Sequence, residues 1–253
     1  MSRSRLFLIG ALVFGWFLLM RAPAATLYAW FAPKSTPVQL YGLEGSLAQG
    51  HAAAVALNGK PLLQDLGWRF RPWWLPLLRA AFQLEGGGAS LKFSGLLSLT
   101  PTGIGLRHVS LDGGIKAILG AAGYGFAPVD GAARLDLSST ELRKGFPVAA
   151  EGSAELRGLA WTLLKDPLPL GSYRIAVHTE QDAITARIDP ESGPLLVEGQ
   201  ARLQSDHGYD YDLRLKARDA TDTALQNLLH ALGQPDPQGQ YHLRGKGKLA
   251  GQP

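Results

Sequence analysis

The sequence predicts a mainly β protein, in which an N-terminal transmembrane helix is followed by an antiparallel, curved or two-layer β-sheet domain with one or two short helices. Three observations predict this. An uncharged apolar run of roughly fifteen residues lies between Arg5 and Arg21, short runs of alternating apolar and polar residues fill the chain from residue 38 onward, and 31 glycines and 16 prolines separate those runs. Alternation with period two, bounded by glycine and proline, is typical of strands joined by turns.

The apolar run predicts a membrane anchor. A bilayer core needs about twenty apolar residues. Residues 22–31 extend the run, because Arg21 can snorkel to the headgroups and Tyr28 and Trp30 are aromatics of the interfacial kind. The residues expected to face lipid are Leu6, Phe7, Leu8, Ile9, Leu12, Val13, Phe14, Trp16, Phe17, Leu18 and Leu19.

Two other interpretations of the run are a cleaved secretory signal and a buried core helix. Ala22-Pro23-Ala24 resembles a cleavage site, but Arg21 stands between it and the apolar run. A core helix would show a polar face, which the run lacks. We therefore expect a single-pass protein of the bacterial inner membrane, with residues 1–5 as a cytoplasmic tail, 6–32 as the anchor with its interfacial extension, and 33–253 as a periplasmic β-rich domain.

Composition and motifs argue against an enzyme. The chain has no cysteine, which excludes disulfides and thiol chemistry, and its net charge of +4 is spread without a basic patch for nucleic acid. Gly-x-Ser-x-Gly, His-x-x-x-His and phosphate-loop patterns do not occur. The densest polar cluster, Asp206, His207, Asp210 and Asp212, fits a polar hairpin tip better than a cation site. We predict no catalytic residue, cofactor, metal or nucleic-acid partner.

The first half of the domain is expected to contain a series of short strands, those between residues 80 and 111 having four to eight residues each. Residues 38–57 predict two strands, and Asn58-Gly59 predicts the tight turn of a hairpin that leads into a third strand over 62–71. Further strands are expected between residues 80 and 111, followed by a short helical excursion near 116–122. Phe146-Pro147 predicts an edge strand or a turn, because proline cannot donate a hydrogen bond to a central ladder.

Residues 72–78 interrupt this pattern with two prolines and two tryptophans. The segment is either a loop that touches a membrane or partner, with Trp73, Trp74 and Leu75 as candidate contact residues, or a short helix that caps the end of a sheet. The more ordinary interpretation, aromatic side chains packed into the core under a loop, is favoured for the two tryptophans.

The second half continues with strands near residues 132–137, 152–156, 159–164, 172–179, 183–188, 195–203 and 209–217. One helix is predicted by a stripe of Leu225, Leu228, Leu229 and Leu232, with Asp222 or Thr221 as its N-cap and Gly233 after its end. In a last strand over 240–249, Gly245 and Gly247 predict a bulge or a close approach of the backbone.

The layout resembles protein N of the type II (general) secretion pathway. The resemblance is carried by the basic tail and anchor, the Gly42-Leu43-Glu44-Gly45-Ser46 turn, the Leu66-Gly67-Trp68-Arg69-Phe70-Arg71-Pro72 segment, the Pro169-Leu170-Gly171-Ser172-Tyr173 strand, the helix at 225–233 and the closing strand. Leu47 stands where the family has a tryptophan. The resemblance implies an inner-membrane accessory component of a machine that exports folded proteins, with other secretion proteins as partners and no catalytic residues.

A second function stays open. A membrane-tethered β-rich domain whose strands are apolar on one face could form an open, curved sheet, similar to the AsmA-type inner-membrane proteins implicated in envelope lipid traffic. Its apolar β-groove would then bind or transfer lipid. Because a closed core and a lipid groove both require the same alternation, the sequence leaves both interpretations standing.

Overall fold

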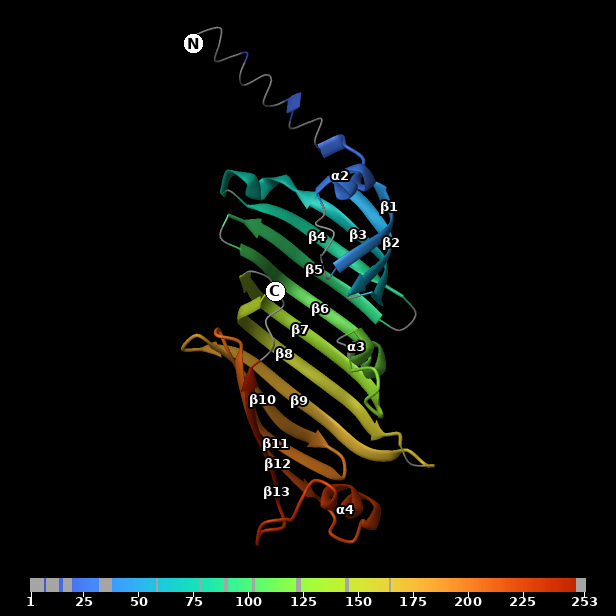
Figure 1. The fold of residues 1–253 in the computed structure, drawn as a ribbon, viewed down its shortest axis with the longest axis vertical. Coiled ribbons are helices and arrows are strands. Elements are labelled where there is room, and N and C mark those ends of the chain that lie inside the picture. The colour runs from blue at the N-terminus through green and yellow to red at the C-terminus, as the bar shows by residue number, and fades with distance from the viewer. Residues whose placement is uncertain are drawn as a thin grey trace.

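The computed structural model describes residues 7, 14–15, 20–31, 38–57, 59–77, 79–88, 91–101, 103–121, 124–143, 146–163 and 165–248. Thirteen strands form one antiparallel sheet in which each strand pairs with the next one along the chain (Figure 1). The expectation of a mainly β, antiparallel fold is confirmed. Among the strands described, the sheet is a single curved layer and not a two-layer sandwich.

The strands are β1 (Val38–Gly45), β2 (Gln49–Leu57), β3 (Lys60–Arg71), β4 (Ala80–Gly87), β5 (Leu91–Thr100), β6 (Gly103–Gly114), β7 (Val129–Arg143), β8 (Phe146–Trp161), β9 (Leu168–Glu180), β10 (Ala183–Ser192), β11 (Leu195–Gln204), β12 (Gly208–Ala217) and β13 (Tyr241–Lys248). The helices are α2 (Ala24–Phe31), the 3₁₀ helix η1 (Pro72–Leu77), α3 (Ile115–Ala121) and α4 (Thr223–His230).

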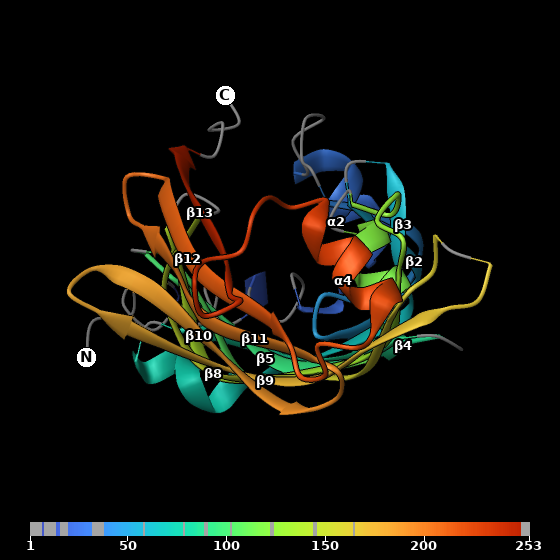
Figure 2. The ribbon, with the colours of Figure 1, turned by 90° about the horizontal axis from the view of Figure 1, so that it is seen from below.

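The sheet is curved, and its helices divide between its two faces. Seen along the long axis, the strands bend into a U whose inner side holds α2, α3 and α4 (Figure 2). The 3₁₀ helix η1 packs against β4 and lies outside the U. We call the concave side, on which α3 and α4 pack, the inner face, and the convex side the outer face.

Each of the two helices α3 and α4 covers one part of the inner face. Ile118 of α3 packs on a cluster that includes Leu91 and Leu111. Leu225 and Leu229 of α4 are almost fully buried against a second cluster built on Leu195, Leu215 and Tyr241. Three leucines of the predicted stripe, Leu225, Leu228 and Leu229, form the packing side of α4, whereas Leu232 lies beyond the end of the helix and is exposed. The side chain of Asp222 caps the helix by accepting a hydrogen bond from the Leu225 N–H at 3.0 Å.

The strands are longer than expected. β7 and β8 contain 15 and 16 residues, and their pairing shifts register three times. A β-bulge interrupts the alternation of side chains without ending the ladder of hydrogen bonds. Alternation therefore predicts several short strands where the structure has one bulged strand. The strands expected at 152–156 and 159–164 are accordingly parts of a single β8, which ends at Trp161.

The expectation that Phe146-Pro147 forms an edge or turn is wrong. Both residues belong to β8, a central strand, and Pro147 pairs with Leu142 where the register shifts. Three other prolines within strands, Pro61, Pro169 and Pro190, also lie beside register shifts. The missing N–H of proline is tolerated there because a bulge already interrupts the regular ladder.

The hairpin predicted at Asn58-Gly59 joins β2 to β3, with Leu57 paired to Lys60 and Gly59 at a φ of +76°. Asn58 itself lies outside the described residues. The short helix expected near 116–122 is confirmed as α3.

Candidate functional site: an apolar inner face and a charged outer pocket

Cross-strand partners in the sheet place apolar residues in continuous rows on the inner face. Directly paired residues lie on the same side of an antiparallel sheet, so the register defines each row. One row crosses eleven strands from β3 to β13, and its residues are Phe70, Phe82, Leu97, Leu106, Thr140, Ala150, Thr179, Ile184, Leu203, Tyr209 and Gly247. This set, the apolar row, contains no charged residue.

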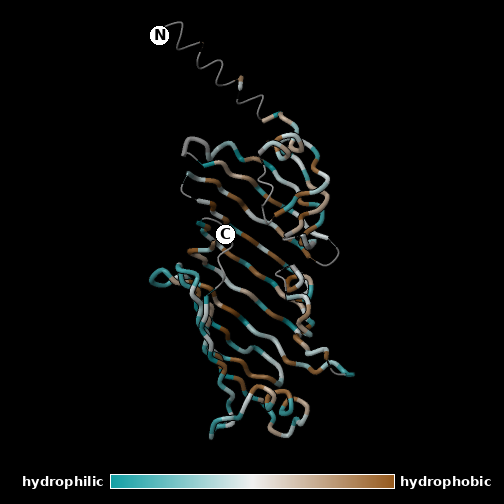
Figure 3. The backbone as a smooth tube through the Cα atoms, viewed as in Figure 1, coloured by the Kyte–Doolittle hydropathy of each residue, from teal (hydrophilic) through white to brown (hydrophobic). Residues whose placement is uncertain are grey.

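A parallel row has the same character nearer to α3 and α4. It contains Phe93, Leu111, Leu135, Ala154, Ile175, Ile188, Gly199, Leu213 and Leu243. The hydropathy colouring shows hydrophobic and hydrophilic residues alternating along the strands (Figure 3). Helix α4 buries the inner face near Leu215, but Leu99 and Ile104 at the other end of the strands remain 39% and 38% exposed. The inner face is therefore only partly covered within the described chain.

Gly245 and Gly247 let the aromatic residues of the inner face lie flat. Gly245 pairs with Tyr211 and Gly247 with Tyr209. A Cβ at residue 245 would lie 2.6 Å from ring atoms of Tyr211, and a Cβ at residue 247 would lie 2.7 Å from the hydroxyl of Tyr209. The expected close approach is confirmed, whereas β12 and β13 pair without a register shift, so the alternative of a bulge is wrong.

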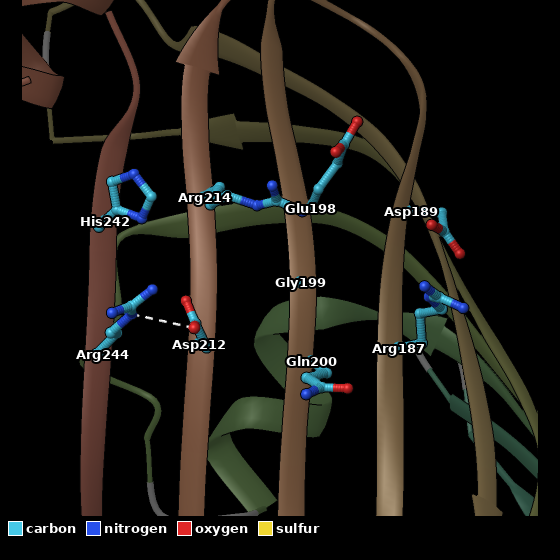
Figure 4. Close-up of a pocket in the computed structure, with 9 residues that line it drawn as sticks. All are labelled: Arg187, Asp189, Glu198, Gly199, Gln200, Asp212, Arg214, His242 and Arg244. Atoms are coloured by element: carbon cyan, nitrogen blue, oxygen red, sulfur yellow. Dashed lines mark ion pairs between the residues drawn. The ribbon is translucent and has the colours of Figure 1, made fainter. Parts of the chain in front are cut away.

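The outer face carries a charged pocket of about 420 Å³ across β10 to β13 (Figure 4). Three arginines and three carboxylates line it together with one histidine: Arg187, Arg214, Arg244, Asp189, Glu198, Asp212 and His242. Arg244 pairs with Asp212 at 3.0 Å, as expected for opposite charges on neighbouring strands. Arg187, Arg214, Asp189 and Glu198 have no ion pair within 4.0 Å in the described chain.

Nothing in the sequence pattern predicted this pocket. Its charges come from four strands, and alternation alone shows which residues share a face of one strand but not which residues of the next strand lie beside them. The only available signal was the regular placement of charged residues on the polar side of 209–217.

A larger pocket of about 630 Å³ lies at the ends of β5, β6 and β7 and is lined by three arginines, Arg79, Arg107 and Arg143, against one carboxylate, Glu141. A smaller pocket of about 170 Å³ surrounds Trp68, whose indole N–H donates to the Ser46 carbonyl at 3.1 Å. Both pockets have mixed polar and apolar linings.

The candidate contact residues Trp73, Trp74 and Leu75 lie in η1. Trp73 is 83% exposed, so the favoured expectation that it packs in the core is wrong. Trp74 is half-buried, and the side chain of Leu75 lies outside the described part. η1 packs against β4, but this contact does not cover the side chain of Trp73.

Most of the expected anchor residues, namely Leu6, Leu8, Ile9, Leu12, Val13, Trp16, Phe17, Leu18 and Leu19, lie outside the described residues. Phe7 and Phe14 are helical and 80% and 66% exposed. Within the part of the chain that the structure describes, none of the helices combines the length and hydrophobicity needed to cross a bilayer.

Two of the three acids in the cluster at residues 206–212 pair with cations of β13. Asp206 pairs with Lys248 at 3.0 Å and also accepts the Gly208 N–H, while Asp212 pairs with Arg244. In the described ranges, no three histidine or acidic side chains gather as metal ligands. The polar hairpin tip is the interpretation that this geometry supports.

Asp236 stabilises the loop between α4 and β13 as a carboxylate. Its oxygens accept hydrogen bonds from the N–H groups of Gln240 and Gln238 and lie 3.0 Å from His242 Nε2. The Gln240 hydrogen bond, then His242 and then Gln238 lower the pKa of Asp236 below its usual value. A carboxyl whose pKa is lower in the folded state adds stability above its unfolded pKa and loses it as pH falls through the folded pKa.

We expect Asp236→Asn to lower the stability of the chain at pH 7 and to have progressively less effect below about pH 4, where the unfolded carboxyl protonates. Urea midpoints measured from pH 7 to pH 2.5 test this. Asp166→Asn, at an exposed carboxylate that makes no hydrogen bond in the described chain, is the matched control and should follow the wild-type curve. If Asp236→Asn lowered the urea midpoint equally at every pH, the stabilisation would not come from the charge of the Asp236 carboxylate.

The fold and these surfaces define an open-sheet β protein with one extended apolar face and one charged face. The chain belongs to the family described as type II secretion system (T2SS), protein N, whose model matches residues 36–244. It is therefore a component of a protein-secretion machinery.

Two relatives support this assignment. The chain is 26% identical to a type II secretion system protein N of Aeromonas hydrophila over 239 residues, which cover 92% of this chain and 93% of the relative. It is also 26% identical to a type II secretion system protein N of Vibrio cholerae serotype O1 over 231 residues, or 86% of this chain and 87% of the relative. No solved structure matches the chain significantly.

Proposed function

We propose that this chain is a non-enzymatic accessory component of the type II secretion machinery, held in the inner membrane by residues 6–32, with residues 33–253 forming a periplasmic domain that contacts other secretion proteins. The observation that supports these contacts most directly is the charged outer pocket. It presents four charged side chains without ion-pair partners in the described chain on the strands of one continuous sheet.

The sheet would act as a scaffold for recognition. Neighbouring strands lie about 4.8 Å apart, so the strands hold the charges of the pocket at regular spacings. Complementary charges on a partner protein would then fix how the two proteins align and which partner is accepted, more than how tightly they bind. A membrane tether adds to this by raising the effective concentration of the domain near partners in the same bilayer.

Exchanging the anchor tests this proposal. Replacing residues 1–21 with a cleavable signal peptide should release the domain into the soluble periplasmic fraction and strongly reduce the secretion of type II substrates into the medium. Replacing residues 6–20 with an unrelated single-pass transmembrane helix should restore secretion. Full secretion by the released domain would contradict the need for an anchor.

Trp73 is a candidate contact residue because a large aromatic side chain that is 83% exposed on a folded surface is typical of an anchor residue in an interface. We expect Trp73→Ala to reduce chemical crosslinking to the other secretion-machinery proteins about tenfold or more without changing the melting temperature. Trp161→Ala is the comparison, since Trp161 packs against the α4 cluster and its loss should lower the melting temperature. An equal loss of thermal stability in Trp73→Ala would show that Trp73 is structural.

A second candidate function is lipid binding, and one specific observation favours it. The inner face belongs to a single open sheet, and its apolar residues Leu99 and Ile104 are more than one-third exposed. Soluble proteins rarely leave a large continuous apolar surface uncovered unless it binds something.

A further inference from the structure

The apolar row on the inner face carries a more specific inference, which rests on the second candidate function. We propose that this row binds an acyl chain of a phospholipid, which lies across the strands along the long axis of the sheet. The segment that we assign to the chain runs from β5 to β11 and includes Leu97, Leu106, Ala150, Ile184 and Leu203.

The chemistry of the row matches hydrocarbon. None of its eleven residues is charged, and the backbone groups of the strands are engaged in the sheet. The Thr179 hydroxyl is also occupied, because it donates to the Ala150 carbonyl at 3.1 Å and accepts the Ala150 N–H at 2.9 Å. A peptide strand would find no hydrogen-bond partners on such a surface, whereas an acyl chain needs none.

The hydroxyl of Thr140, unlike that of Thr179, makes no hydrogen bond within the described chain. This hydroxyl is buried. Such a group costs free energy unless a ligand satisfies it. An ester carbonyl of a glycerophospholipid accepts a hydrogen bond and is joined directly to the acyl chain, so it fits a lone hydroxyl within an apolar row.

The dimensions also fit. Ten strand spacings separate β3 from β13, which corresponds to about 48 Å along the row. One acyl chain spans half of a bilayer core, or about 15 Å. The segment from β5 to β11 covers six spacings, about 29 Å, which exceeds the length of one chain. The row therefore has room for a whole acyl chain on the part of the inner face that lies away from α4.

The source of the lipid follows from the position of the N-terminal elements. Helix α2, which directly follows the apolar run of the sequence, lies at the β1 end of the sheet, where the hydroxyl of Tyr28 accepts the Leu40 N–H at 3.2 Å. The row begins two strands away, on β3. A phospholipid of the membrane that holds residues 6–32 would reach this end of the row first.

Site-specific photocrosslinking in cells tests the proposal. Each control position is the sequence neighbour of a test position and lies on the opposite face of the sheet. The photoreactive amino acid p-benzoylphenylalanine is placed at Leu106 or Val177 on the inner face, and at the adjacent residues Arg107 or Ala176, which point to the outer face and are exposed. The full-length chain is expressed in cells whose phospholipids carry radioactive phosphate, and it is purified after irradiation.

We expect phosphate label on the chain at Leu106 and Val177 to be at least tenfold higher than at Arg107 and Ala176. Equal labelling at all four positions, or none, would overturn the proposal. A protein-sized adduct without phosphate at Leu106 would also overturn it and would show that a partner protein covers the row. A second variant, Thr140→Val, keeps the shape of the side chain and should lower the label at Leu106.

The same cells separate this inference from the main proposal. Secretion of type II substrates and crosslinking through Trp73 report on the secretion role, whereas phosphate label at Leu106 reports on lipid. Loss of lipid label with normal secretion would reject the lipid inference alone, and lipid label in a chain that does not support secretion would reject the secretion proposal alone.

Discussion

Replacing Leu229 with alanine is expected to lower the free energy of unfolding by about 3 kcal/mol, because truncating a fully buried leucine loses its transfer free energy and leaves a cavity. Leu229 is 1% exposed and packs with Leu225 against Leu195, Leu215 and Tyr241. This cluster is where α4 attaches to the inner face at the C-terminal end of the sheet. Urea unfolding, followed by circular dichroism, measures the change.

Leu232→Ala is the matched control. Leu232 belongs to the same sequence stripe but is 47% exposed beyond the end of α4, so its truncation should change stability by about 0.5 kcal/mol or less. A loss below about 1 kcal/mol for Leu229→Ala would show that α4 does not hold this end of the sheet.

Replacing Gly199 with alanine is the second large effect that we expect. Gly199 lies on the floor of the charged pocket at a φ of +149°, a conformation that residues with a Cβ rarely adopt. An added Cβ would collide with the Asp212 carbonyl oxygen and lie 2.8 Å from the Leu213 Cα. Both obstacles are backbone atoms of β12, so relief requires moving the strand, at a cost of about 1–3 kcal/mol.

Displacing β12 should also move Asp212 away from Arg244, which now lies 3.0 Å from it. Gly199→Ala is therefore expected to weaken crosslinking to other secretion proteins as well as to lower the urea midpoint. Gly114→Ala is the control, because a Cβ there would meet no atom within 4 Å. Unchanged stability in Gly199→Ala would mean that β11 and β12 adjust freely at this point.

Local patterns in the sequence predicted the local structure of this protein well. Alternation in residues 209–217 correctly assigned the apolar and polar sides of β12, and the spacing of Leu225 and Leu229 with Asp222 at the N-cap predicted α4. These features depend on residues within a few positions of each other, where side-chain period and capping decide the conformation. The exposure of Trp73 was not predicted, because it depends on how η1 is oriented against β4, and alternation of residue types does not show that orientation.

Alternation and layout in the sequence were enough to predict a chain rich in β-strands with an apolar side, and a resemblance to the secretion family to which it belongs. That the strands form one open, curved sheet became visible only in the folded structure. Bulges at Pro147, Pro169 and Pro190 are part of the reason, since each shifts the register between neighbouring strands, and register decides which residues of distant segments share a row or a pocket. A closed sandwich and an open sheet need the same alternation, so the difference between a buried core and an exposed apolar face appears only when the thirteen strands are placed together.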